Sequence, residues 1–96
     1  MKQSRKTKPG DIFEDLGFHP SEAAHLQLRS SVMTRLIAEV ERKGLTQAEA
    51  AKCMGISQPR VSDLMRGKLH LFSLDTLVAL LSRMGFRFDF KVTEVA

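Results

Sequence analysis

The chain has 96 residues, of which 43% are hydrophobic and 27% charged, and a formal net charge of +4. This length suits one domain, since two hydrophobic cores rarely fit in so few residues. No apolar run approaches the roughly 18 residues of a membrane span, and the basic N-terminus lacks the apolar stretch of a secretory signal. The single cysteine, Cys53, excludes an internal disulfide framework and a cysteine-based zinc site. The composition therefore predicts a soluble, cytoplasmic protein.

Charge is unevenly distributed along the chain. Residues 1–10 hold four basic and no acidic side chains, which predicts a disordered basic tail. This tail could follow a DNA backbone or enter a minor groove, or it could serve solubility alone. Residues 9–22 contain four acidic and no basic side chains, whereas residues 52–68 contain four basic side chains against Asp63. The acidic and basic patches fit two different partners, or they are simply solvated surfaces.

The N-terminal part of the domain begins with residues 11–18, where apolar residues alternate with acids up to Gly17. This pattern predicts one or two amphipathic turns in the segment. It could cover the domain's own core, or it could contribute to a surface that binds a basic partner protein.

A long helix is predicted over residues 22–43, because Met33, Leu36, Ile37 and Val40 recur at helical spacing. Ser21 is the expected N-cap, since its hydroxyl can accept a free backbone N–H. Ser30 and Ser31 could bend or divide this helix. Glycine at position 44 is expected to stop it.

Two short helices are predicted within residues 45–67. The first follows a capping box of Thr46 and Glu49 and ends at Gly55, with Cys53 on its inner face. The second begins after Ser57 and ends at Gly67. A further helix is expected over residues 74–84, capped by Ser73 and stopped by a glycine.

The last segment changes its period from helical spacing to strict alternation. Apolar residues at every second position predict a half-buried strand, formed by Phe86, Phe88, Phe90 and Val92. A lone strand leaves its backbone groups unpaired, which is costly when it is buried. We therefore expect these residues to form an antiparallel ribbon with a second copy. The alternative is a strand lying unpaired along the helices.

Residues 45–67 also have the layout of a helix-turn-helix motif, in which the second helix is held proud of the surface to enter a DNA major groove. Ala51 is small where the two helices approach each other, and Gly55 permits the positive φ of the turn. The wedge between the helices is filled by Ile56, Val61 and Leu64.

This stretch resembles the XRE-type, lambda-repressor-like helix-turn-helix regulators. The resemblance is carried by Gln47, Ala48, Glu49, Ala51, Gly55, Ser57, Gln58, Val61, Leu64 and Gly67. Over residues 11–85 it narrows to a subgroup that includes HigA-like antitoxins. The resemblance implies a small protein that binds a toxin and represses its own operon. Pro59 departs from the wider family, because it takes a position where a base-reading side chain is often found.

The expected roles at a DNA interface follow from the helix-turn-helix layout of residues 45–67. Gln58 could read an adenine, and Arg60 could reach a guanine edge or a phosphate. Asp63 could accept from a cytosine amino group, or it could pair with Arg60 or Arg66. The full set expected at the interface is Gln47, Ser57, Gln58, Arg60, Ser62, Asp63, Arg66 and Lys68.

The sequence thus predicts an all-α, lambda-repressor-like bundle of about five helices with a single C-terminal β-strand that pairs across a dimer. Residues 11–85 form the DNA-binding domain, and residues 86–96 form the dimerisation strand. We expect no catalytic, metal or cofactor site and no small-molecule ligand. The expected partners are double-stranded DNA with two half-sites, a second copy and a small basic toxin. A regulator without a toxin and a toxin-neutralising module without useful DNA affinity are the alternatives.

Overall fold

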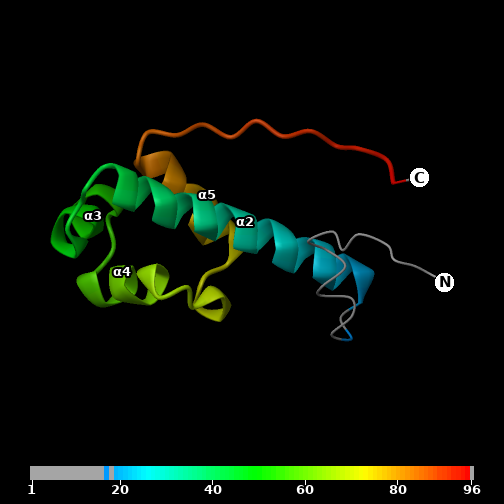
Figure 1. Ribbon diagram of the computed structural model, residues 1–96, viewed down its shortest axis with the longest axis horizontal. Coiled ribbons are helices and arrows are strands. Elements are labelled where there is room, and N and C mark those ends of the chain that lie inside the picture. Colours follow the sequence, from blue (N-terminus) through cyan, green and yellow to red (C-terminus); the bar gives the residue numbers. More distant parts are fainter. Residues whose placement is uncertain (1–16, 18, 96) are drawn as a thin grey trace.

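The computed structural model describes residue 17 and residues 19–95, and this part of the chain is all-helical (Figure 1). Its elements are α2 (Pro20–Arg42), α3 (Gln47–Met54), α4 (Gln58–Met65), the 3₁₀ helix η1 (Leu69–Leu71) and α5 (Leu74–Arg83). The predicted element at residues 11–18 lies outside the described residues except for Gly17, so the expected five α-helices are four here. None of the described helices is long and apolar enough to cross a membrane.

Helix α2 begins at Pro20, one residue before the predicted cap. His19 is the N-cap, because its Nδ1 accepts the backbone N–H of Ser21 at 3.1 Å. The backbone N–H of His19 donates in return to Glu22 Oε1 at 3.1 Å. The expectation that Ser21 caps the helix is therefore wrong. Proline suits the first helical position, where its fixed φ is helical and its missing N–H costs nothing.

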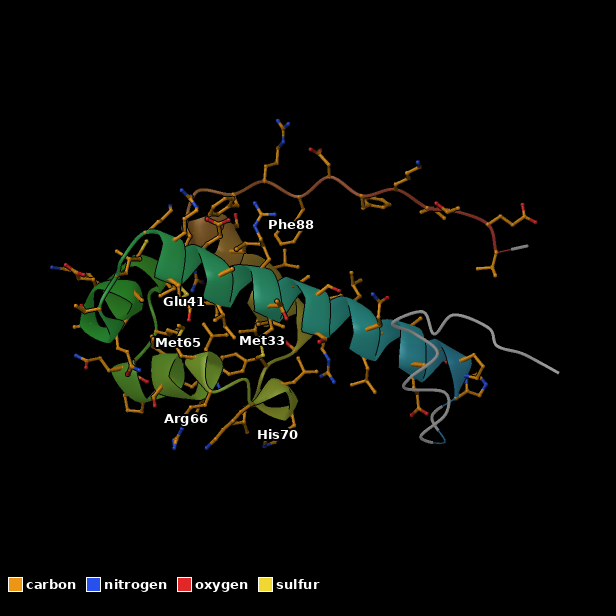
Figure 2. The ribbon with its side chains drawn as sticks, in the orientation of Figure 1. Met33, Glu41, Met65, Arg66, His70 and Phe88 are labelled. Carbon is orange, nitrogen blue, oxygen red and sulfur yellow. The ribbon has the colours of Figure 1, made fainter. Side chains whose placement is uncertain are left out.

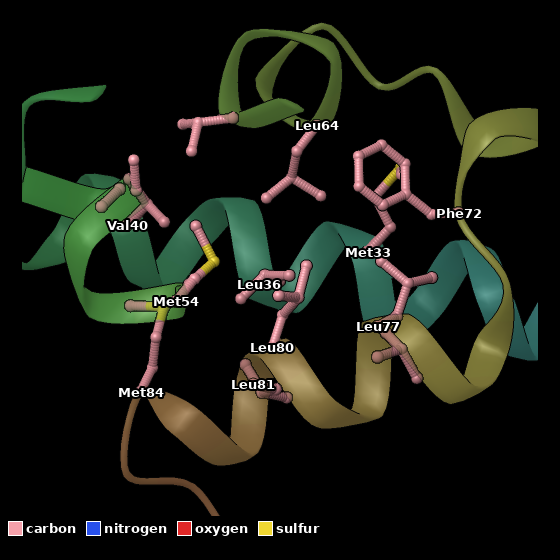
Figure 3. Close-up of a cluster of buried hydrophobic side chains, with 14 residues drawn as sticks. Met33, Leu36, Val40, Met54, Leu64, Phe72, Leu77, Leu80, Leu81 and Met84 are labelled. Atoms are coloured by element: carbon pink, nitrogen blue, oxygen red, sulfur yellow. The ribbon is translucent and has the colours of Figure 1, made fainter. Parts of the chain in front are cut away.

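The hydrophobic core lies between the C-terminal half of α2 and the three later α-helices (Figure 3). Helix α2 continues without a break through Ser30 and Ser31, so these residues do not divide it. Its N-terminal half extends beyond the bundle, whereas its C-terminal half packs against α5, α4 and η1 (Figure 1). The largest fully buried side chains come from every part of the bundle: Leu36, Met54, Val61, Leu64, Phe72, Leu77 and Leu80.

Helices α3 and α4 form the predicted helix-turn-helix pair. The Thr46 hydroxyl accepts the backbone N–H of Glu49 at 3.1 Å, and Glu49 Oε1 accepts that of Thr46 at 2.8 Å. This confirms the capping box at the start of α3. Gly55 ends α3 with a φ of 69°, a left-handed conformation that side chains other than glycine rarely adopt.

Cys53 is exposed, contrary to the expectation that it faces the core. The buried side of α3 is made by Ala50, Ala51 and Met54. At about 100° per residue, Cys53 lies roughly a quarter turn or more from the centre of that arc. A helix this short buries only one narrow side. A residue such as Cys53, which lies just outside that side, is therefore exposed although Met54 next to it is buried.

The C-terminal segment, residues 86–95, has no strand in this single chain. It leaves α5 and runs extended along α2 in the opposite direction (Figure 1). Its start is anchored because the Phe86 ring lies under two cations, 5.5 Å from the Arg35 guanidinium and 5.1 Å from Lys43 Nζ. Lys43 Nζ also donates to the backbone carbonyl of Met84 at 3.1 Å. The predicted strand is thus absent here, since the described part of one chain offers it no backbone partner.

Glu39 is a buried carboxylate on α2. Arg35 Nε donates to its Oε2 at 2.8 Å, and Arg42 Nε donates to its Oε1 at 2.7 Å. The hydrogen bond from Arg35, and then that from Arg42, lowers the pKa of the Glu39 carboxyl below its ordinary value of 4.5. Both hydrogen bonds favour the charged form, which outweighs the effect of burial.

We predict that Glu39→Gln lowers the free energy of unfolding at pH 7 and that this deficit shrinks as the pH falls. The folded-state pKa lies below the unfolded one, so the stabilisation is present above about pH 4.5 and is lost as the pH drops through the folded value. Urea denaturation of both proteins between pH 7 and pH 3 measures this. Glu41→Gln on the exposed side of α2 is the matched control. A deficit for Glu39→Gln that does not change with pH would contradict the assignment.

Candidate nucleic-acid interface

The outward side of α4 is determined by the side that is buried. Val61 and Leu64 are fully buried, and α4 packs through them against α3 and α2. Gln58, Pro59 and Arg66 are consequently exposed on or beside the opposite side. In Figure 2 the labelled Arg66 side chain points away from the body of the protein. The helix therefore presents polar and cationic groups to the solvent on a rigid base.

Three of the predicted residues lie at helix starts and are exposed. Gln47 is the first residue of α3, and Gln58 is the first residue of α4. Ser57 caps α4, and its Oγ accepts the backbone N–H of Arg60 at 3.4 Å. A hydroxyl that accepts in this way still has its own hydrogen to donate to a phosphate. The backbone N–H of Gln58 is also available, because the first N–H groups of a helix have no partner within it.

The Arg60 side chain contacts other parts of the protein instead of extending into solvent. Its guanidinium lies 4.2 Å from the centroid of the Phe72 ring, and its Nη1 donates to the backbone carbonyl of Leu71 at 3.1 Å. Phe72 itself is almost completely buried. These contacts connect α4 to Leu71 of η1 and to Phe72, which follows it. Arg60 therefore has a structural role that its sequence position does not reveal.

Asp63 pairs with Lys68, not with the arginines that the sequence suggested. Lys68 Nζ lies 3.4 Å from Asp63 Oδ1, and both side chains are partly exposed. No ion pair of the described residues joins Asp63 to Arg60 or Arg66. A half-exposed pair of this length contributes little to stability and can exchange for other partners. The two residues remain accessible to a polyanion near the end of α4.

The exposed turn of η1 adds residues that sequence reasoning missed. Of residues 68–72 only Lys68 was expected at the interface, yet η1 also places His70 and Leu71 at the surface. His70 points to the same side as Arg66 in Figure 2. Ser62 is partly exposed on α4. No side chain of the described residues caps this turn, and Arg60 of α4 contacts Leu71 and Phe72 at its end.

The assembled surface can bind a polyanion and hydrogen-bond its edges. Arg66 and Lys68 supply positive charge, Gln58 an amide, and Ser57 a hydroxyl. Amide and guanidinium groups on one helix side are the pattern that reads base edges, while cations and helix starts contact phosphates. Residue 17 and residues 19–95 contain no group of three His, Cys, Asp or Glu side chains arranged to hold a metal ion.

Comparison with known proteins agrees with this geometry. The family model described as a helix-turn-helix domain matches residues 12–93. A protein of Mycobacterium tuberculosis named "Putative antitoxin HigA3" is 40% identical over 65 residues. That alignment covers 65% of this chain and 59% of the relative, so the chain matches less than two thirds of the relative's length. Together these matches confirm the resemblance recognised in the sequence.

We predict that Arg60→Ala lowers the free energy of unfolding by about 1–2 kcal/mol, since it removes a cation–π contact and a charged hydrogen bond. Arg66→Ala removes the same side chain six residues later, where it is exposed, and should stay within about 0.5 kcal/mol of the unmodified protein. Urea denaturation at pH 7 compares the two variants. Equal stability of the two variants would contradict a structural role for Arg60.

Proposed function

We propose that this chain, which belongs to the helix-turn-helix domain family, is a sequence-specific transcriptional repressor whose α4 enters the major groove of DNA. One observation carries the proposal: Val61 and Leu64 are fully buried, while Gln58 at the start of α4 and Arg66 at its C-cap remain exposed. No described segment covers the outward side of α4 (Figure 1). The protein acts by occupying DNA and catalyses no reaction.

In this proposal the interface residues have separate tasks. Gln58 reads a base edge through its amide, with Ser62 and Asp63 further along the helix. Arg66 and Lys68 contact phosphates, and Gln47 and Ser57 do so from the two helix starts. Arg60 keeps its contact with Phe72 and contributes mainly by orienting α4 and η1. Phosphate contacts give affinity and register, whereas base contacts give sequence preference.

We further propose that the protein is the antitoxin of a toxin–antitoxin pair and represses its own operon. The support is the name of the Mycobacterium tuberculosis relative, together with the helix-turn-helix family. The toxin is expected to be a small basic protein, because residues 9–22 carry four acids and no base. Binding to the toxin and to DNA would use different parts of the chain.

The functional form is proposed to be a homodimer on two half-sites. One short recognition helix makes few contacts, and two copies spaced by about one turn of DNA, roughly 34 Å, would double them. The exposed apolar side chains of residues 86–95 supply a surface for the contact between copies. Figure 1 places this segment and α4 on opposite sides of α2, so dimerisation there leaves α4 uncovered.

We predict that Arg66→Ala weakens binding to all DNA sequences and lowers the salt dependence of log K by about 1 per protomer. The control is Arg87→Ala, which removes an equal charge on the far side of α2. Because Arg87 lies in the segment proposed for the contact between copies, sedimentation first verifies that this variant is still a dimer. Titration of the upstream DNA of its own gene at several salt concentrations measures both. Equal salt slopes for the two variants would place the DNA elsewhere.

We predict that Gln58→Ala costs about 1–3 kcal/mol on the preferred sequence and almost nothing on unrelated DNA, because it removes a base contact and no charge. Competition with unrelated duplexes in the same titration gives the ratio of the two affinities. An unchanged ratio would show that Gln58 does not read a base.

The antitoxin role is tested by co-expression with the protein encoded beside it. We expect the two chains to purify together and the neighbour alone to arrest growth. Failure of both, with operator binding intact, would leave a regulator without a toxin. Co-purification without any operator binding would leave a module that only neutralises the toxin.

A further inference from the structure

The C-terminal segment carries apolar side chains that the single chain does not bury. Phe90 is 89% exposed and Val92 is 84% exposed, although they continue the alternation that begins at Phe86. The hydrogen bonds of the described residues include none from the backbone of residues 87–95 to another segment. Both the apolar side chains and the backbone edge of this segment therefore lack a partner within the described chain.

One side of the segment faces α2. The Phe86 ring lies under Arg35 of α2 and Lys43, the C-cap of that helix. Phe88 lines a groove with Val32 and Leu81, and its side chain points toward α2 in Figure 2. Alternation places Phe90 and Val92 on the same side as Phe86 and Phe88. The free backbone edges therefore point sideways, where a second strand can add without disturbing the anchored phenylalanines.

Charge selects how two identical segments can pair. In a symmetric antiparallel pair of identical strands, the numbers of any two residues that lie opposite each other add to the same sum. The residue whose number is half that sum lies opposite its own copy and is the centre of the pair. A centre at Asp89 or Lys91 would place like charges directly opposite each other, which is destabilising. A centre at Phe90 instead places Asp89 opposite Lys91 on both sides. It also sets Phe90 against Phe90 and Phe88 against Val92.

The two neighbouring symmetric centres use the segment less well. A centre at Phe88 would also pair opposite charges, Arg87 with Asp89, but it would leave Val92 opposite Met84 at the end of α5. A centre at Val92 would place Phe90 opposite Glu94 and Asp89 opposite Val95. The Phe90 centre alone pairs the whole stretch from residue 86 to residue 94.

We propose that the occupant of this edge is a second copy of the chain, paired as an antiparallel ribbon whose two-fold axis passes between the two Phe90 residues. This inference rests on the proposed homodimer and adds its register. The ribbon covers the apolar side chains of both segments against the two α2 helices. Packing on a helix is what a two-stranded ribbon needs, because it is marginal in water by itself.

The register also determines where the recognition helices point. The two-fold axis of an antiparallel pair is perpendicular to its sheet, and here the sheet has its apolar side toward α2. The axis therefore runs from the ribbon toward α2. A rotation about it keeps both copies of α4 on the side away from the ribbon (Figure 1). Both recognition helices then face the same way, as binding to one duplex requires.

Cysteine cross-linking tests the register in the full-length chain. Cys53 is exposed and is first replaced, as Cys53→Ser, so that only introduced thiols react. Phe90→Cys lies on the axis and should form a disulfide between copies under mild oxidation. Val92→Cys and Phe88→Cys are the matched controls, since each would lie about 13 Å along the ribbon from its own equivalent, beyond disulfide reach. Mixing these two variants should produce a cross-link between them.

A charge exchange provides an independent test that needs no cysteine chemistry. Asp89→Lys and Lys91→Asp each place like charges opposite one another in a homodimer and should weaken dimerisation about tenfold. An equimolar mixture restores opposite charges at every such position, so the mixed dimer should predominate. Sedimentation and native mass spectrometry measure both effects. If mixed and unmixed dimers form in the equal proportions that chance alone gives, the register is overturned.

The remaining outcomes separate this inference from the proposal it rests on. A monomer by sedimentation at all accessible concentrations overturns the homodimer and the register together. A dimer in which Phe90→Cys does not cross-link, or in which Val92→Cys or Phe88→Cys alone links to itself, overturns only the register. A complex in which a co-purified toxin replaces the second copy, so that Phe90→Cys no longer links two copies, overturns the choice of occupant.

Discussion

Burial of two aliphatic side chains on α4 is the constraint on which the interface depends. An eight-residue helix has few contacts with which to be oriented, and Val61 and Leu64 provide them by filling the space against α3 and α2. Truncating either side chain would leave a cavity. It would also remove contacts that fix the orientation of α4 about its own axis. The exposed amide and guanidinium groups gain their direction from this packing, and Arg60 stacked on Phe72 secures the following turn.

Helix α2 separates the two surfaces of the protein. Its C-terminal half supplies the core that supports α4. Phe86 packs against the edge of that core, and the extended segment runs on the side of α2 away from α4 (Figure 1). The cations on α2 serve both stability and arrangement, since Arg35 pairs with Glu39 and also lies over the Phe86 ring. The proposed surface for DNA and the proposed surface for a second copy can therefore coexist on a small chain without competing for the same residues.

Sequence reasoning was accurate where a helix cap or a turn depends on residues only a few positions apart in the chain. The capping box of Thr46 and Glu49, the cap at Ser73 and the left-handed Gly55 all depend on local geometry, and the structure confirms each. It failed where two local solutions compete, as at the start of α2, where His19 rather than Ser21 is the cap. It also failed for Cys53, because the buried arc of a short helix is set by its neighbours.

The sequence by itself determined the helical architecture, the positions of α3, α4 and α5, and the apolar residues that form the core, since these follow from periodicity and caps. Only the tertiary structure decided that Arg60 stacks on Phe72, that Asp63 pairs with Lys68, and that η1 presents His70 at the surface beside α4. Such contacts join residues whose separation in space depends on how whole helices pack, and no local pattern encodes that distance.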